Sequence, residues 1–152
     1  MKEALSEREE RMAELLRETT VALGCALIDK VGEEEAAMVF SQLMEQRVEK
    51  MKSKGLLGKG FRALADMVLT TAPVFKQELT FDVENMIART KGCGFWEAGK
   101  KMGYEKTPLC IRCKANSDTV LKYVLPGYKK KIEKSLWWGD DECYMTYHKE
   151  ED

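Results

Sequence analysis

Histidine is nearly absent from this sequence, which contains one, His148, among its 152 residues. A Ser-His-Asp triad or a Cys-His pair would have to use that single imidazole. A zinc site with two or more histidine ligands is excluded within one chain. The sequence also has no phosphate-binding loop, no dinucleotide glycine fingerprint and no paired-histidine zinc-protease motif. The signals of several common enzyme classes are therefore missing.

An excess of charge of either sign is missing as well. Lys and Arg number 25 and Asp and Glu 26, for a net charge of −1, whereas a nucleic-acid-binding surface needs a basic excess. We interpret the lysine run at 129–131 as the solvent-facing side of a strand. No apolar stretch approaches the roughly 20 residues that cross a bilayer, and the charged residues 1–10 do not resemble a secretory signal. We expect a cytoplasmic protein that binds neither nucleic acid nor membrane.

The five cysteines are an odd number and follow no signal peptide, which favours reduced thiols over a disulfide framework. Cys25 stands apart from the others. Cys93 lies between two glycines, Cys110 and Cys113 form a Cys-x-x-Cys pair, and Cys143 follows the last turn. Three interpretations of this group remain open.

In the first interpretation the four later cysteines hold zinc or an iron–sulfur cluster, since positions i and i+3 of a helix share a face. Only one Cys-x-x-Cys pair is present, where structural zinc sites usually have two. In the second, one thiol is a nucleophile, such as Cys110, which follows Pro108 near the start of a helix, although no histidine base lies nearby. In the third interpretation the cysteines fill the core. Cys25 and Cys143 favour it, because both fall at apolar positions of their predicted helix or strand.

The first 76 residues predict helices. A helix from Ser6 to Gly32 is indicated by a capping box of Ser6 and Glu9, and helices follow over 33–54 and 59–72. Leu5, Met12, Leu16, Leu23 and Leu27 recur at spacings of seven and four, which places them on one apolar face of the first helix. The small residue Gly24 lies within this pattern and allows another helix to approach closely.

In the second half of the chain the spacing of the apolar residues changes from that of a helix to that of a strand. Alternation predicts one strand over 77–90, and helices follow over 95–102 and 108–124. Two last strands are predicted on either side of the turn at 139–141, with Trp137 and Trp138 on opposite faces of the first. The fold class is α+β in the order αααβααββ: a helical amino-terminal half packed with a small antiparallel sheet that ends in a β-hairpin. One domain is expected over 1–152, with a helical part at 1–76 and a cysteine-bearing part at 77–152.

Aromatic and charged residues near the thiols are candidates for a ligand site. Trp96, Tyr128 and Trp138 could line a cavity, and Arg112 could hold a ligand carboxylate. Asp118 is a candidate base, to act with Cys113 on an sp² carbon. For the tryptophan that faces away from the core, an oligomer interface is an equally good explanation.

The carboxyl-terminal half carries a recognisable series of short motifs. They read Cys-Gly-Phe-Trp-Glu-Ala at 93–98, Met-Gly at 102–103, Leu-Cys-Ile-Arg-Cys at 109–113, Asp118, Leu-Pro-Gly at 125–127 and Leu-Trp-Trp-Gly-Asp-Asp-Glu-Cys-Tyr-Met-Thr-Tyr at 136–147. Over about residues 78–148 the chain resembles the L-2-amino-thiazoline-4-carboxylic acid hydrolase-like family. It is more distantly similar to vinyl-reductase-type small-molecule-binding domains, which share the Gly-acid-x-Cys ending in the last hairpin.

The resemblance implies a helix-flanked antiparallel sheet and hydrolytic opening of a small cyclic amidine-like carbon–nitrogen or carbon–sulfur system. The positions that carry over are Cys93, Cys110, Cys113, Asp118, Asp140 and Cys143. Two other functions stay open. One is a non-catalytic sensor or carrier for a small molecule, a tetrapyrrole or a metal, which the lack of a base near any cysteine favours. The other is a structural protein that forms a homo-oligomer, favoured by the long first helix and the paired tryptophans.

Overall fold

The computed structural model describes residues 5–151, which begin with three helices: α1 (Glu7–Val31), α2 (Glu33–Ser53) and α3 (Gly60–Thr71). The predicted capping box is present at the start of α1, where the Glu9 carboxylate accepts a hydrogen bond from the Ser6 backbone N–H at 2.8 Å. Gly32 ends this helix with a φ of 86°, a value that glycine adopts readily. The sequence therefore predicted all three helices with nearly correct bounds.

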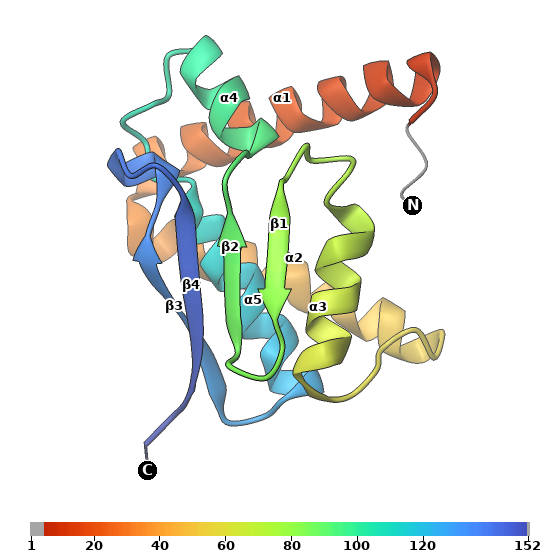
Figure 1. The fold of residues 1–152 in the computed structure, drawn as a ribbon. Helices are drawn as coiled ribbons and strands as arrows, with labels where there is room; N and C mark the ends of the chain where they lie inside the picture. Colours follow the sequence, from red (N-terminus) through yellow and green to blue (C-terminus); the bar gives the residue numbers. More distant parts are fainter. Residues whose placement is uncertain (1–4, 152) are drawn as a thin grey trace.

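The rest of the chain forms a four-stranded sheet and two more helices. The elements are β1 (Leu79–Asp82), β2 (Ile87–Thr90), α4 (Gly94–Lys101), α5 (Cys110–Val124), β3 (Tyr128–Lys134), the 3-10 turn η1 (Leu136–Trp138) and β4 (Cys143–Lys149). The strands are antiparallel in the order β1-β2-β4-β3. Figure 1 shows α5 and α2 behind this sheet, with α3 beside it and α1 crossing above. The α+β class and the carboxyl-terminal hairpin are confirmed.

The single strand predicted over 77–90 is wrong, because the chain turns back within it. The Asp82 carboxylate accepts hydrogen bonds from the backbone N–H and the side-chain amide of Asn85, at 3.0 and 2.8 Å. Met86 then takes a positive φ of 56°. Asp and Asn side chains that bond to nearby backbone favour turns, so β1 and β2 form a hairpin and the sheet has one strand more than predicted.

The strand predicted to include both tryptophans ends at Lys134. The Ser135 hydroxyl accepts a hydrogen bond from the Trp137 N–H at 3.2 Å and starts the 3-10 turn η1. The two indoles still have different environments, since Trp137 is 9% exposed and Trp138 is 55% exposed. The predicted separation is confirmed, although a turn produces it and not the alternation of a strand.

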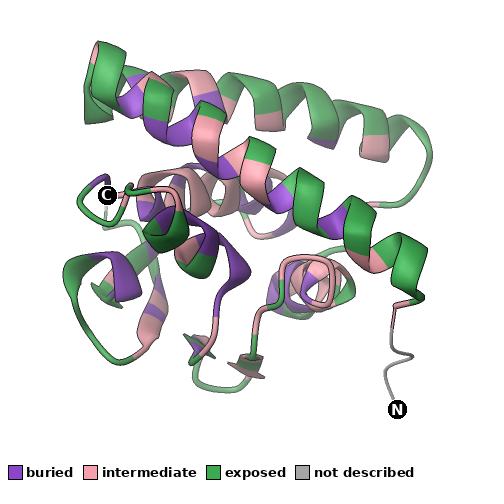
Figure 2. Ribbon diagram, turned by 90° about the horizontal axis from the view of Figure 1, so that it is seen from above, coloured by how far each residue is buried: buried purple, intermediate pink, exposed green. Residues whose placement is uncertain are grey.

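The apolar face predicted for α1 points mostly to solvent, although its residue Leu27 packs against a core cluster. Met12, Leu16 and Leu23 are exposed, and Figure 2 shows exposed residues along the outer side of this helix. The buried residues of α1 are Ala13, Arg17, Val21, Gly24, Cys25 and Ile28. Many of them are small, so neighbouring elements come close: a Cβ atom placed on Gly24 would lie 2.6 Å from Cδ1 of Leu109. The close approach expected at Gly24 is therefore confirmed.

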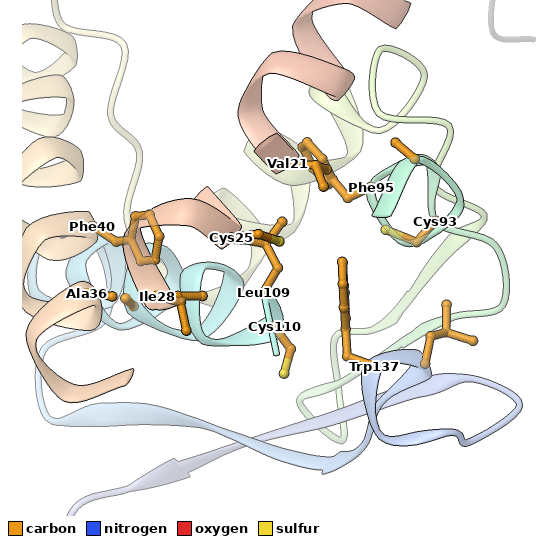
Figure 3. Packing of buried hydrophobic residues seen from close by; sticks show 13 residues of the cluster. Val21, Cys25, Ile28, Ala36, Phe40, Cys93, Phe95, Leu109, Cys110 and Trp137 are labelled. Carbon is orange, nitrogen blue, oxygen red and sulfur yellow. The ribbon is translucent and has the colours of Figure 1, made fainter. Parts of the chain in front are cut away.

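Buried apolar side chains form two clusters. One joins α1 and α2 to the starts of α4 and α5 and includes Cys25, Cys93 and Cys110 (Figure 3). The other lies between the sheet, α3 and the end of α5. Among the described residues, no helix has the length and apolarity that crossing a membrane requires.

Trp137 is held in the first cluster by close contacts with α4. Its ring meets that of Trp96 edge to face, with 4.9 Å between the centroids, and a Cβ on Gly99 would lie 2.4 Å from its Cη2 atom. We expect Gly99→Ala to lower the free energy of unfolding by about 1–2 kcal/mol, because overpacking outweighs the gain in helix propensity. Urea denaturation measures this. Glu97→Ala, an exposed change in the same helix, should stay within about 0.5 kcal/mol of the wild type; equal stabilities for the two variants would contradict the packing.

Candidate functional site

A cavity of about 170 Å³ lies between the inner face of the sheet, α5 and α3. Successive residues of a strand point to opposite faces, so alternate positions of all four strands reach it. These are Leu79, Phe81, Ala88, Thr90, Lys130, Ile132, Cys143, Met145 and Tyr147. The strand register places them in rows across one face, as in the pairing of Ala88 with Met145 and of Met145 with Ile132. The sheet thus supplies a mostly apolar floor.

One face of α5 forms the opposite wall. Arg112, Cys113, Asn116, Ser117 and Val120 all line the cavity, and their spacing is that of neighbours on a helix surface. One end is closed by Phe75, Phe95, Ser135 and Trp137, and α2 and α3 supply Met44, Arg47, Leu64, Met67, Val68 and Thr71. The site is therefore built from both halves of the chain.

The charges that line the cavity are all positive. Arg47, Arg112 and Lys130 contribute cations, and none of the lining residues in the described part of the chain is Asp or Glu. The guanidinium of Arg112 lies over the ring of Phe95, 5.4 Å from its centroid. Arg47 is exposed and so lies where the cavity meets solvent. The lining favours an anionic ligand.

Lys130 is the most unusual of these cations because its side chain is buried, with only 6% of the residue exposed. Its Nζ donates a hydrogen bond to Ser117 Oγ at 3.3 Å. Within residues 5–151, no carboxylate lies within ion-pair distance of this ammonium group. Buried charges are normally paired, so this lysine lacks the partner that its burial would require.

The interpretation of residues 129–131 as a solvent-facing run is therefore wrong for Lys130. A strand cannot turn three consecutive residues to one face, and Lys131 is the exposed neighbour, paired with Glu133 at 3.1 Å. Lys130 has the same phase as Tyr128 and Ile132, which were predicted to alternate with polar residues. This shared spacing could have identified Lys130 from the sequence as a residue of the inner face of the strand.

Tyr147 lies beside Lys130 on the neighbouring strand, where the two residues are paired in the sheet register. Burial raises the pKa of the Tyr147 hydroxyl, although the nearby Lys130 charge acts in the opposite direction. The phenol is consequently neutral at physiological pH. It adds a hydroxyl group, but no negative charge, to the surroundings of the ammonium group.

The structure brings Cys93, Cys110, Cys113 and Cys143 to the same cavity, while Cys25 is buried on the inner side of α1 in the first core cluster. In the view of Figure 3 the Trp137 ring stands between the labelled side chains of Cys93 and Cys110. No set of three or more Cys, His, Asp or Glu side chains within residues 5–151 is arranged to hold a metal ion. The geometry thus gives no support to the predicted four-thiolate zinc or iron–sulfur site.

Burial makes three of these thiols, those of Cys93, Cys110 and Cys143, poor nucleophiles. It raises the pKa of Cys93 to about 12 and that of Cys110 to about 11, and the neighbouring thiols add to both shifts. Burial also raises the pKa of Cys143, against hydrogen bonds from the Leu136 N–H and Ser135. The single imidazole, on His148, is exposed and bonds to Thr146 at 2.7 Å. No thiol therefore has a histidine to activate it.

The predicted base Asp118 lies outside the cavity lining and is occupied elsewhere. Its carboxylate pairs with Lys114 and accepts a hydrogen bond from the Lys130 backbone N–H at 2.7 Å. It thereby joins α5 to β3. Asp140 has a comparable task, accepting a hydrogen bond from the Ser135 N–H at 2.8 Å. Both carboxylates hold backbone in place.

The predicted ligand-binding residues are only partly brought together. Arg112 lines the cavity. Trp96 packs against Trp137, Tyr128 packs in the second core cluster, and the exposed Trp138 lies beside a separate groove along β3. The sequence reasoning missed Lys130, and it also missed Arg47 and Ser117, for which it offered no signal.

A search against protein-family models finds no match for this chain, and a search of the curated proteins finds none either. The resemblance to the thiazoline carboxylate hydrolase-like family therefore stays a prediction.

The raised thiol pKa values predict slow alkylation of the folded protein. At a given pH a higher pKa leaves less thiolate, so we expect Cys93 and Cys110 to resist iodoacetamide up to about pH 9, above the reference thiol pKa of about 8.5. In the urea-unfolded chain all five cysteines should react. Peptide mass spectrometry after a timed reaction measures this for each cysteine. Rapid modification of Cys93 at neutral pH in the folded protein would contradict the assigned environment.

Proposed function

We propose that the cavity binds a small carboxylate, or a similar monoanion, whose apolar body has about the size of one ring. The observation that carries this proposal is the buried ammonium group of Lys130, which lines the cavity beside Ser117 with no carboxylate paired to it. An anionic ligand would give this charge its partner. Removing an ammonium group from water costs several kcal/mol, which is the order of the effective penalty found in proteins. An opposite charge can compensate this cost.

The size of the cavity limits the ligand. Its volume of about 170 Å³ is close to that of an engineered cavity of about 150 Å³ that holds benzene. A benzoate-like or thiazoline carboxylate therefore suits it. A tetrapyrrole, which has four such rings joined in a macrocycle, is too large.

The arrangement of polar and apolar groups also suits such a ligand. The floor and the end are mostly apolar, with Phe95 and Trp137 at the end beside the thiols, which in their neutral form act as small apolar groups. Lys130 from the floor and Ser117 from the wall offer donors at one position, and the exposed Arg47 adds positive potential at the mouth. Ligand pockets commonly combine an apolar lining with a few polar groups that fix orientation.

The variant Lys130→Met tests this proposal, because it replaces the ammonium group by an apolar chain of similar length. We expect it to weaken binding of benzoate or a thiazoline carboxylate by about ten- to a hundredfold, the value of a charge-assisted hydrogen bond. Isothermal titration calorimetry measures the affinity, and tryptophan fluorescence gives a second signal because Trp137 lines the cavity. Stability should be unchanged or higher, since replacing a buried charge by an apolar group is often stabilising.

The matched control is Lys131→Met, the same change one residue along β3 on the exposed face. It should bind the carboxylates as the wild type does. The neutral amide of each ligand should bind the wild type weakly. Its affinity for Lys130→Met should be the same as its affinity for the wild type. The proposal fails if the wild type binds amide and carboxylate equally.

Hydrolysis of such a carboxylate is a second candidate function, favoured by the position of Cys113. This thiol lines the same cavity next to Arg112 and is only partly buried. Ring opening adds one water to the ligand, so mass spectrometry of a thiazoline carboxylate incubated with the protein detects it. We expect Cys113→Ser to abolish turnover and to leave binding intact. Binding without turnover by the wild type would leave the carrier function alone.

A further inference from the structure

The helix α1 has a second apolar face that nothing in the structure covers within residues 5–151. Met12 is 62% exposed, Leu15 58%, Leu16 48% and Leu23 68%. These side chains lie on the side of α1 opposite to the buried Val21 and Ile28. Single exposed apolar residues are common, but a contiguous apolar surface on one helix marks an interaction site.

The residues of this face follow a seven-residue repeat. Met12, Thr19 and Ala26 are seven apart, as are Leu16 and Leu23, and the two series together recur every 3.5 residues on average. That period is the one that two long helices need to keep a seam in contact. The 25 residues of α1 give a helix about 37 Å long, which suits such a pairing.

We propose that this face of α1 binds the same face of a second copy of the chain, with the two helices antiparallel. The apolar centre then closes on itself: Met12 of each copy meets Leu23 of the other, and Leu16 packs near Thr19. A two-fold axis of this kind uses one patch twice and ends in a closed dimer. The proposal concerns a surface separate from the cavity and does not rest on the proposed ligand.

The charges at the two ends of the face select a second copy in the antiparallel orientation. Arg8 and Glu9 flank the amino end, and Asp29 and Lys30 flank the carboxyl end. In an antiparallel pair Arg8 comes next to Asp29 of the other copy along one flank. Glu9 and Lys30 continue the seven-residue spacing of Leu16 and Leu23 at the two ends of the seam, so Glu9 of one copy lies within about one helical turn of Lys30 of the other. In a parallel pair Glu9 would face Glu9 and Lys30 would face Lys30, which is repulsive. The face is thus complementary to itself in one orientation.

The first test is the oligomeric state of the full chain and of Leu23→Glu, by sedimentation equilibrium over a range of concentrations. The wild type should be dimeric. Leu23→Glu should raise the dimer dissociation constant by roughly a hundredfold or more, because one exposed leucine per copy loses its buried site. The matched control is Leu56→Glu, which changes a residue of similar exposure, 66%, outside α1 and should stay dimeric. Circular dichroism checks that both variants keep their helix content.

The second test reverses charges. Arg8→Glu and Asp29→Arg should each weaken the dimer about tenfold by placing like charges together, and the double variant should recover most of the wild-type affinity. Each change puts the new charge where the helix dipole favours it, so the fold should tolerate both. Asp29→Arg also removes an acceptor from Thr107, which the Arg8→Glu variant leaves in place. Arg62→Glu on α3 is the control and should have no effect.

Three results would overturn the inference. One is a wild-type chain that stays monomeric at the highest concentrations reached, whatever else the face binds. Another is a dimer that survives Leu23→Glu, since the contact then lies elsewhere. The third is a double variant, Arg8→Glu with Asp29→Arg, whose dimer is no tighter than the dimers of the two single variants. An antiparallel contact between these residues requires the dimer affinity to recover when both charges are reversed.

Discussion

The buried ammonium group of Lys130 is the constraint on which the cavity depends. Strand alternation turns Lys130 to the same face as Ile132, and α5 covers that face. The backbone N–H of the same residue is bound by Asp118 of α5 at 2.7 Å. The lysine is therefore fixed at the helix–sheet junction by its backbone, while its side chain has to find partners inside the cavity.

This constraint explains why the region around Lys130 differs from an ordinary core. An apolar side chain at that position would allow α5 and the sheet to pack as they do around Val120 and Met145. A charge demands polar neighbours, here the hydroxyls of Ser117 and Tyr147, and it leaves a binding preference for an anion. The four thiols that line the cavity then act mainly as small neutral groups, because burial holds most of them protonated.

The parts of the fold that the sequence predicted well are those with long, uniform periods and clear ends. The helices α2, α3 and α5 fall close to the predicted bounds, because each has a continuous apolar stripe and a glycine or proline beyond it. The hairpin of β1 and β2 was missed because Ile87 continues the apolar spacing of Leu79, Phe81 and Val83 in the sequence. In the structure the phase changes at the turn, and Ala88 and Thr90 face the cavity. The antiparallel pairing of the two strands and the Asp82–Asn85 hydrogen bonds show that the chain reverses. The hypothesis of a shared site required the four later cysteines to meet although they are distant in the sequence, and all four line one cavity, but the cation beside them was not anticipated.

The sequence by itself determined that α1 is a long, capped helix and that β3 alternates, since both follow from local spacing and capping chemistry. It did not determine which apolar face of α1 is buried. That choice was made by tertiary packing, where Gly24 lets Leu109 approach within contact and the larger leucines remain outside. Local periodicity records that a face is apolar, whereas the neighbour that covers it depends on shapes contributed by residues far away in the chain.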